Sequence, residues 1–263
     1  MIRMPGPHQL YRLIPDDDSV RILGQASRKS LGRRFTLVSW NMHKARKRAW
    51  LDDLTLLSED ADFVLLQEAV LHGDRPHAFH LESGFEWVMG QNFAHRLRGG
   101  RTSGVKTGSR IASISQQVLR STDQEPVIRL PKTILATAYN LKAPDETLLL
   151  LNIHAINFVS VIKFSRQIEQ LKFVIEQHHG PVVVAGDFNT WNPRRRKILF
   201  RAVAQFELHR VPVAAPRWRH LGQVLDHVFY RGVVLKNAWA VLNVKSSDHI
   251  PLKVEFERWV PAT

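Results

Sequence analysis

The sequence contains no cysteine among its 263 residues. This excludes a disulfide framework, thiolate sites for zinc or iron–sulfur clusters, and a cysteine nucleophile. Any metal must therefore be held by oxygen or imidazole donors. Long apolar runs are missing as well, because stretches such as 148–151 and 182–185 fall far short of the roughly 20 residues that cross a bilayer. We therefore expect no transmembrane segment.

The N-terminus lacks the pattern of a secretory leader. Its first apolar stretch is interrupted by Tyr11-Arg12 and by the three consecutive aspartates 16–18, whereas a leader needs an unbroken apolar region. We expect a cytoplasmic, monomeric protein. Residues 1–34 mix Pro, Gly, Ser and basic residues ahead of the first strong strand. They predict a basic N-terminal arm, followed by a single domain over residues 35–263.

Acidic residues are scarce relative to basic ones. There are 24 Asp and Glu against 37 Lys and Arg, which gives a formal net charge of +13. The excess is concentrated in the windows 1–50, 94–110 and 191–220. A single basic run is usually a solvated surface, but three runs favour a polyanionic partner. Nucleic acid and anionic lipid headgroups both meet that description.

Short bursts of Val, Leu and Ile bounded by Gly, Pro, Asn and Asp predict β-strands. We expect strands at 35–40, 63–67, 104–117 with a break near Gly108, 133–139, 147–154, 181–186, 224–230, 233–244 and 250–256. Apolar residues recur at steps of three and four over 161–177, which predicts a helix with one core face. Further helices are expected at 49–59 and 193–205. Strands mixed with few helices predict packed sheets with helices outside, within one domain.

Several of these strands end in a polar residue that is capable of chemistry. The residues are Asn41, Glu68, His154 and Asp187, with Asn189 two positions after the last. A lone Asn or Asp after a strand is usually a turn former or a helix cap, but glutamate is neither. Strand ends that converge at one edge are a common way to hold reactive groups. We therefore expect these side chains to gather in one site.

Asp226 lies inside the apolar stretch 224–229, where an unpaired carboxylate would be costly. Side chains alternate along a strand, so the adjacent His227 points to the opposite face. We predict that Asp226 pairs instead with His249, which follows Asp248 between two apolar strands. A carboxylate bonded to one imidazole nitrogen raises the basicity of the other, as a general base or a phosphate-binding imidazole requires.

Glu68 supplies a hard oxygen ligand in a chain that lacks thiols, with help from Asn41 and Asp248. Oxygen donors suit magnesium or manganese better than zinc. We therefore expect a Mg²⁺ site, with Mn²⁺ as the alternative.

Seven short motifs follow one another along the chain: Ser39-Trp40-Asn41, Leu66-Gln67-Glu68, Gly104-Val105 with Ser109-Arg110, Asn152-Ile153-His154-Ala155, Gly186-Asp187-Phe188-Asn189, Leu225-Asp226 and Ser247-Asp248-His249-Ile250-Pro251. In this order they resemble the endonuclease/exonuclease/phosphatase superfamily, over residues 35–257. That superfamily includes deoxyribonuclease I, abasic-site endonucleases, neutral sphingomyelinases and inositol polyphosphate phosphatases. The sequence also looks like an uncharacterised bacterial subgroup.

The resemblance implies an α+β fold of the deoxyribonuclease I type, a four-layer α/β/β/α sandwich of two mixed β-sheets with helices on the outside. It implies magnesium-dependent hydrolysis of phosphate esters at one edge of that sandwich. Glu68 would be the chief metal ligand, Asn41 would lie beside it, and Asp248 would support the metal shell. One metal is the expectation, and a second could bind near Asp187.

The resemblance also implies roles for the remaining site residues. His154 would bond the phosphate or act as general acid, Asp187 would orient or deprotonate the attacking water, Asn189 and Asn157 would contact the phosphate, and Asp226 would orient His249. Whether Asp187 or His249 is the base stays open. Arg194 and Arg195 directly follow the Asp187 loop and are expected to contact the substrate phosphates, and Trp191 could stack on a base or fill the loop.

DNA is the expected substrate, because cationic patches beside an acidic site favour nucleic acid. A dedicated abasic endonuclease is disfavoured, since Gln223 stands where those enzymes carry a pocket tryptophan that Trp218 would have to replace. Three alternatives remain: a lipid phosphatase or phosphodiesterase acting on phosphoinositide or sphingomyelin, an inactive nucleic-acid-binding module, and a haloacid dehalogenase-like phosphatase. The last is disfavoured because Asn189 replaces its second acid.

Overall fold

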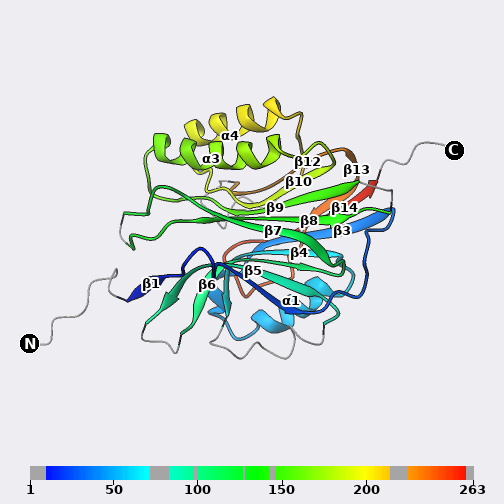
Figure 1. Ribbon diagram of the computed structural model, residues 1–263, viewed down its shortest axis with the longest axis horizontal. Helices are drawn as coiled ribbons and strands as arrows, with labels where there is room; N and C mark the ends of the chain where they lie inside the picture. The colour runs from blue at the N-terminus through cyan, green and yellow to red at the C-terminus, as the bar shows by residue number, and fades with distance from the viewer. Residues whose placement is uncertain are drawn as a thin grey trace, which may run out of the picture.

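Two β-sheets lie face to face at the centre of the protein, and helices cover both outer faces (Figure 1). The structure is a computed structural model that describes residues 10–71, 83–96, 100–126, 128–142, 146–213 and 224–258. The predicted four-layer sandwich of two mixed sheets is confirmed. Of the helices in these ranges, none is both long and apolar enough to span a bilayer.

The first sheet is built from both ends of the chain. Its strands are β1 (Tyr11–Leu13), β2 (Val20–Gly24), β3 (Arg34–Asn41), β4 (Phe63–Leu71), β5 (Glu86–His95), β6 (Thr102–Ser109), β13 (Val233–Ala240) and β14 (Leu252–Arg258). They lie in the order β1-β5-β6-β4-β3-β14-β13, with β2 also paired to β5. β3 and β4 run parallel, and the other pairs are antiparallel. The short helix η2 (His43–Ala45) and helix α1 (Trp50–Ser58) connect β3 to β4.

The second sheet comes from the middle of the chain. Its strands are β7 (Ser113–Arg120), β8 (Thr133–Asn140), β9 (Thr147–His154), β10 (Val182–Asp187), β11 (His209–Arg210) and β12 (Asp226–Arg231). Their order is β11-β12-β10-β9-β8-β7, and only β9 and β10 pair in parallel among these described strands. Helices α3 (Val161–Glu176) and α4 (Pro193–Gln205) pack side by side on its outer face (Figure 1).

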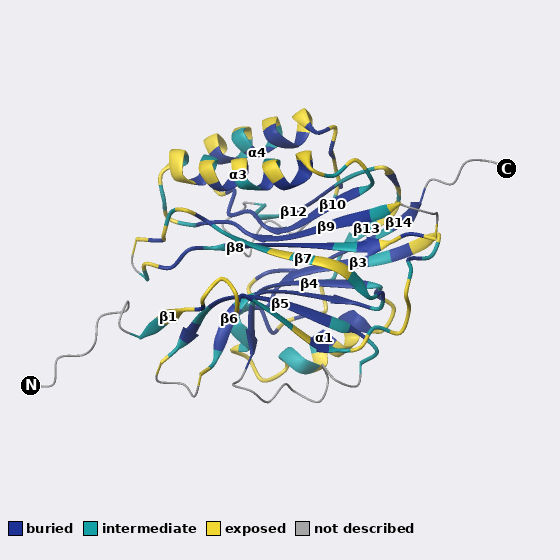
Figure 2. Cartoon of the chain, viewed as in Figure 1, coloured by how far each residue is buried: buried dark blue, intermediate teal, exposed yellow. Residues whose placement is uncertain are grey.

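Apolar side chains fill three layers between these elements. The predicted stripe of α3, including Phe164, Ile168 and Leu171, is buried against the second sheet, while the opposite face of the helix is exposed (Figure 2). The central strands β9 and β10 are buried on both faces, which explains their unbroken runs of Leu and Val. Each such fully buried side chain contributes about 1.5–3 kcal/mol.

The predicted N-terminal arm is wrong for the described part of residues 1–34. β1 and β2 pair antiparallel with β5, and Ile14, Leu23 and Leu31 are buried. Leu31 also bridges to Leu141 beside the second sheet. Edge strands are short and half exposed, so their composition resembles that of a loop. Residues 1–9 lie outside the described ranges.

Two buried amides tie the sheets together close to one edge of the sandwich. The Gln67 side-chain nitrogen donates to Asn152 Oδ1 at 2.8 Å, and the Asn152 side-chain nitrogen donates to the Lys106 carbonyl at 3.0 Å. Both side chains are fully buried. Because buried polar groups require partners, this pair fixes the position of β4 in the first sheet relative to β9 in the second sheet.

Candidate active site

The site lies where the two parallel strand pairs end. Asp187, the last residue of β10, is in register with His154 of β9 on one side and with Asp226 of β12 on the other. Residues directly opposite on adjacent strands project from the same face of a sheet. Three predicted site residues therefore face one space without any contribution from a loop.

Gly186 allows this close pairing. Its φ is +146°, a conformation that favours glycine, and a Cβ at this position would lie 2.0 Å from the Ile153 carbonyl oxygen. Any other residue would push β10 away from β9. The glycine of the Gly-Asp-Phe-Asn motif therefore positions Asp187 beside His154.

Asp187 is the centre of the site and is almost fully buried. Its Oδ2 accepts a hydrogen bond from the Asn41 side chain at 3.1 Å and lies 3.6 Å from His154 Nε2 and 3.8 Å from His249 Nε2. Burial raises the pKa of Asp187 to about 6, although the nearby His249 opposes the rise. The carboxylate is thus ionised at neutral pH and has a proton affinity suited to a base.

Asp226 and His249 form the predicted pair, with 2.8 Å between Oδ2 and Nδ1. Ser247 holds the imidazole in place, because its hydroxyl donates to the Asn41 carbonyl at 2.6 Å and accepts from the His249 backbone nitrogen at 3.1 Å. Burial alone would lower the pKa of His249, but Asp226 and then Asp187 outweigh it and raise the pKa to about 10. The ring is therefore an imidazolium at neutral pH.

His227 points away from the site, as strand alternation predicts. It lies 2.8 Å from Thr190 Oγ1 among the rings of Phe188, Phe200 and Phe229. Burial lowers its pKa to about 3, so it packs as a neutral core residue.

His154 carries no charge at neutral pH. Burial and then the charge of Lys132 lower its pKa well below the usual value. The Lys132 ammonium lies 3.4 Å from His154 Nε2 and 3.5 Å from Glu125 Oε1. An ammonium can only donate, so His154 Nε2 is the acceptor and its proton is on Nδ1. Lys132 could not be recognised as a site residue from the sequence, because a single lysine before a strand carries no distinctive pattern.

Glu68 is placed by a β-bulge. Between the pairs Leu66↔Lys106 and Ala69↔Gly104, two residues of β4 face one residue of β6, and Glu68 has a φ of +49°. Bulges and strained backbone often redirect a side chain at a functional site. The Glu68 carboxylate lies 3.9 Å from Lys44 Nζ and lines a small pocket of about 30 Å³ together with Lys132 and His154.

Oxygen donors at this edge suit a hard divalent cation. Within the described ranges, no three His, Asp or Glu side chains form a metal-binding cluster. Magnesium needs only one or two carboxylates because it keeps several waters. Glu68 supplies a carboxylate, and Asn41 supplies a carbonyl oxygen that already accepts from the His43 backbone nitrogen at 3.1 Å.

The two asparagines predicted to bind phosphate, Asn157 and Asn189, lie in the loops that follow β9 and β10. The Asn189 backbone nitrogen donates to Asp187 Oδ1 at 2.9 Å, and its side-chain nitrogen donates to the Ala155 carbonyl at 2.8 Å. Asn157 Oδ1 accepts from Trp191 Nε1 at 2.8 Å. Asp248 stands at the rim with a side chain that is 53% exposed, 3.3 Å from His43 Nδ1.

Arg195 does not contact the substrate space. It is buried, and its guanidinium donates to the carbonyls of Ile156, Asn189 and Val159. Arg195 shares the inward face of α4 with Leu199, Ala202 and Val203, a spacing of i, i+4, i+7 and i+8 that could have revealed its burial. Arg194 is exposed, and its contact with substrate stays a prediction. Gln223 and Trp218 lie outside the described residues.

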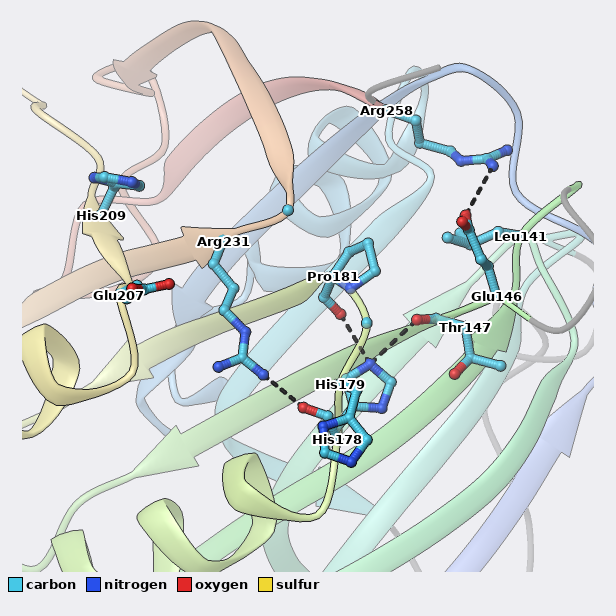
Figure 3. Close-up of a pocket in the computed structure, with 12 residues that line it drawn as sticks. Leu141, Glu146, Thr147, His178, His179, Pro181, Glu207, His209, Arg231 and Arg258 are labelled. Carbon is cyan, nitrogen blue, oxygen red and sulfur yellow. Dashed lines mark hydrogen bonds and ion pairs between the residues drawn. The ribbon is translucent and has the colours of Figure 1, made fainter. Parts of the chain in front are cut away.

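A larger cavity of about 890 Å³ lies at the opposite end of the second sheet, around the start of β10 (Figure 3). Its lining includes His178, which precedes β10. The His178 Nε2 atom lies 3.1 Å from the carbonyls of Thr147 and Pro181. The Arg231 guanidinium donates to the His178 carbonyl at 2.5 Å. These contacts give His178 a structural role.

The fold is that of the deoxyribonuclease I-like class. Residues 38–249 match the Endonuclease/Exonuclease/phosphatase family, and the chain belongs to that family, whose members are generally phosphoesterases. The chain is similar to the UPF0294 protein VP2298 of Vibrio parahaemolyticus, at 36% identity over 229 residues that cover 84% of this chain and 77% of the relative.

Solved structures show the same fold at low sequence identity. The endonuclease/exonuclease/phosphatase from Beutenbergia cavernae superposes with a TM-score of 0.65 and 18% identity, over 86% of this chain and 72% of that one. The human Nocturnin catalytic domain with bound sulfate anion superposes with a TM-score of 0.60 and 13% identity, over 96% and 99% of the two chains.

Proposed function

We propose that the protein is a magnesium-dependent phosphodiesterase that cleaves DNA. The observation that carries the proposal is the buried Asp187 carboxylate, which lies between the rings of His154 and His249 with Asp226 bonded behind His249. The His249 imidazolium beside this carboxylate, together with the ammonium of Lys132 3.4 Å from His154 Nε2, supplies positive charge that suits a phosphate oxygen gaining negative charge during a reaction.

The charge states favour Asp187 as the base. Its pKa of about 6 leaves it ionised and able to take a proton from an attacking water. The His249 imidazolium, held by Asp226, would bond a phosphate oxygen and balance its negative charge. Neutral His154 would donate its Nδ1 proton to a phosphate oxygen, so it would orient the phosphate rather than serve as the main acid.

Glu68 and Asn41 would hold the magnesium ion. When bound, the ion neutralises charge on the phosphate and on the leaving oxygen, which acid–base groups do poorly. The Lys44 ammonium lies 3.9 Å from the Glu68 carboxylate and pairs with it. DNA is the proposed substrate because the chain carries +13 and because phosphate contacts supply most of the nonspecific affinity for nucleic acid.

The test is to incubate the pure protein with and without Mg²⁺ and, in parallel, with plasmid, an abasic duplex, single-stranded DNA, a phosphoinositide and a phosphomonoester. Asp187→Asn and His249→Ala are the inactive controls. We expect Mg²⁺-dependent DNA cleavage that EDTA and both substitutions abolish. If only the phosphoinositide is hydrolysed, the substrate is a lipid phosphate and not DNA. If the protein binds these molecules but hydrolyses none of them, the proposal that it is an enzyme is overturned.

A further inference from the structure

One amide oxygen at the rim of the site holds two exposed aromatic residues. Asn157 Oδ1 accepts from Trp191 Nε1 at 2.8 Å and from the Phe158 backbone nitrogen at 2.9 Å. Trp191 is 39% exposed and Phe158 is 74% exposed. Phe158 follows His154 by four residues and Trp191 follows Asp187 by four. Both rings are therefore carried by the loops that leave the two central site residues.

The backbone of Phe158 is held in an unfavourable conformation. Its φ is +53°, a region that bulky residues rarely adopt and that persists only where the surroundings enforce it. The Phe158 side chain itself gains little from burial. The strain is thus not repaid by packing of the ring against the core, which points to a role outside the folded chain.

Hydrogen bonds from buried side chains to the neighbouring backbone hold Phe158 in this conformation. The Asn157 backbone nitrogen donates to Glu125 Oε1 at 2.9 Å. The Arg195 guanidinium donates to the Ile156 carbonyl at 2.9 Å and to the Val159 carbonyl at 3.1 Å, and it lies 5.2 Å from the Trp191 ring centre. The backbone on both sides of Phe158 is therefore held in place, and so is the Trp191 ring, before any ligand arrives.

We propose that Phe158 and Trp191 form a stacking ledge that receives unpaired nucleobases next to the scissile phosphate. This inference rests on the proposed function and narrows its substrate class to single-stranded DNA. Every base has a π face, so aromatic platforms bind single strands with little sequence preference. A paired base is already stacked in its duplex and offers no free face to the ledge. Arg194 is exposed at the start of α4, on the chain segment that carries Trp191, and is available to a neighbouring phosphate.

The experiment compares two single strands of equal length, an oligodeoxynucleotide and a backbone of abasic tetrahydrofuran units. For the wild type we expect a lower KM with the base-carrying strand. Phe158→Ala should raise that KM about tenfold, within the range for loss of one stacked base, with kcat changed less than threefold. KM for the abasic strand should not change. Phe173→Ala, which removes a 58% exposed ring from α3 instead of from the site loop, is the matched control.

Phe158→Gly separates binding from folding. Glycine tolerates the positive φ, so the melting temperature should stay the same or rise, while KM rises as it does for Phe158→Ala. A fall in melting temperature would show that the ring supports the fold and would overturn the ledge. An unchanged KM in both variants, with DNA still cleaved by the wild type, would also overturn it and leave the proposed function standing.

Two further outcomes are distinct. Cleavage of neither strand by the wild type would overturn the ledge, and it would overturn the proposed function as well only if plasmid and the abasic duplex also stay intact. Loss of binding to anionic phospholipid vesicles in Phe158→Ala, with KM for the oligodeoxynucleotide unchanged, would assign the rings to a lipid surface and overturn the inference.

Discussion

The two ends of strand β10 use histidine in opposite ways. At its end, His249 meets the carboxylates of Asp226 and Asp187, which raise the pKa of the imidazole to about 10 against the effect of burial. At its start, the His178 ring meets the backbone carbonyls of Thr147 and Pro181, and burial lowers its pKa. The His249 ring is thus held in its charged form by carboxylates, whereas the His178 ring forms hydrogen bonds with backbone carbonyls.

This difference teaches that buried charge, and not cavity size, marks the candidate active site. The cavity near His178 has a volume of about 890 Å³, while the pocket beside Glu68 has only about 30 Å³. The ion pair at the large cavity, Arg258 with Glu146, leaves Glu146 58% exposed. Asp187, by contrast, is a buried carboxylate, and its ionised form is stabilised by His249, by the Asn189 backbone nitrogen and by the Asn41 side chain.

The largest effect should come from Asp187→Asn. Removing the proposed base should reduce turnover of single-stranded DNA by about 10³–10⁴-fold, the upper part of the range for general base catalysis. Steady-state kinetics would measure it. Glu146→Gln makes the same chemical change at the other end and should leave turnover within twofold. Equal losses in both variants would remove the functional distinction between the two ends.

The second-largest effect should be the difference in pKa between the imidazole rings of His249 and His178. A side-chain NMR titration should find His249 protonated at pH 7–9 and His178 neutral at pH 7. The folded pKa of His249, about 10, lies above its ordinary 6.5, so its stabilising contribution is complete below pH 6.5 and is lost as the pH rises through 10. The pKa of His178 is lowered, so its contribution is present above pH 6.5 and is lost on acidification. A neutral His249 at pH 8 would contradict the comparison.

Asp226→Asn should have a smaller effect on turnover, about 10²-fold, because the amide still orients the ring but no longer stabilises its charge. The same titration should show a lower pKa for His249 in this variant and no change for His178. Wild-type turnover together with a lower pKa would separate the imidazolium from the reaction.

The smallest effect should come from Arg231→Met at the large cavity. Its guanidinium donates to the carbonyls of His178 and Phe206, so its loss should lower the free energy of unfolding by about 1–2 kcal/mol. Turnover below the melting temperature should not change. Urea denaturation and kinetics on one sample would measure both, and a loss of activity without a loss of stability would contradict a structural role.

Much of the site could be predicted because its acids and imidazoles lie at strand ends or inside apolar strands, where local patterns make them conspicuous. Lys132 could not be predicted, because its closeness to His154 arises from the pairing of β8 with β9 and not from its neighbours in sequence. Strand β5 was missed for a related reason. Its polar residues Gln91 and Asn92 resemble a turn, yet both are buried, and the Asn92 side chain donates to the Pro131 carbonyl.

The position of β14 between β3 and β13 has a consequence for protein synthesis. Until residues 249–258 have left the ribosome, β3 presents an open edge that could pair with other chains, and Asp226 has no imidazole to neutralise it. A nascent polypeptide that lacks these residues would therefore have an incomplete candidate site and an exposed strand edge that favours association.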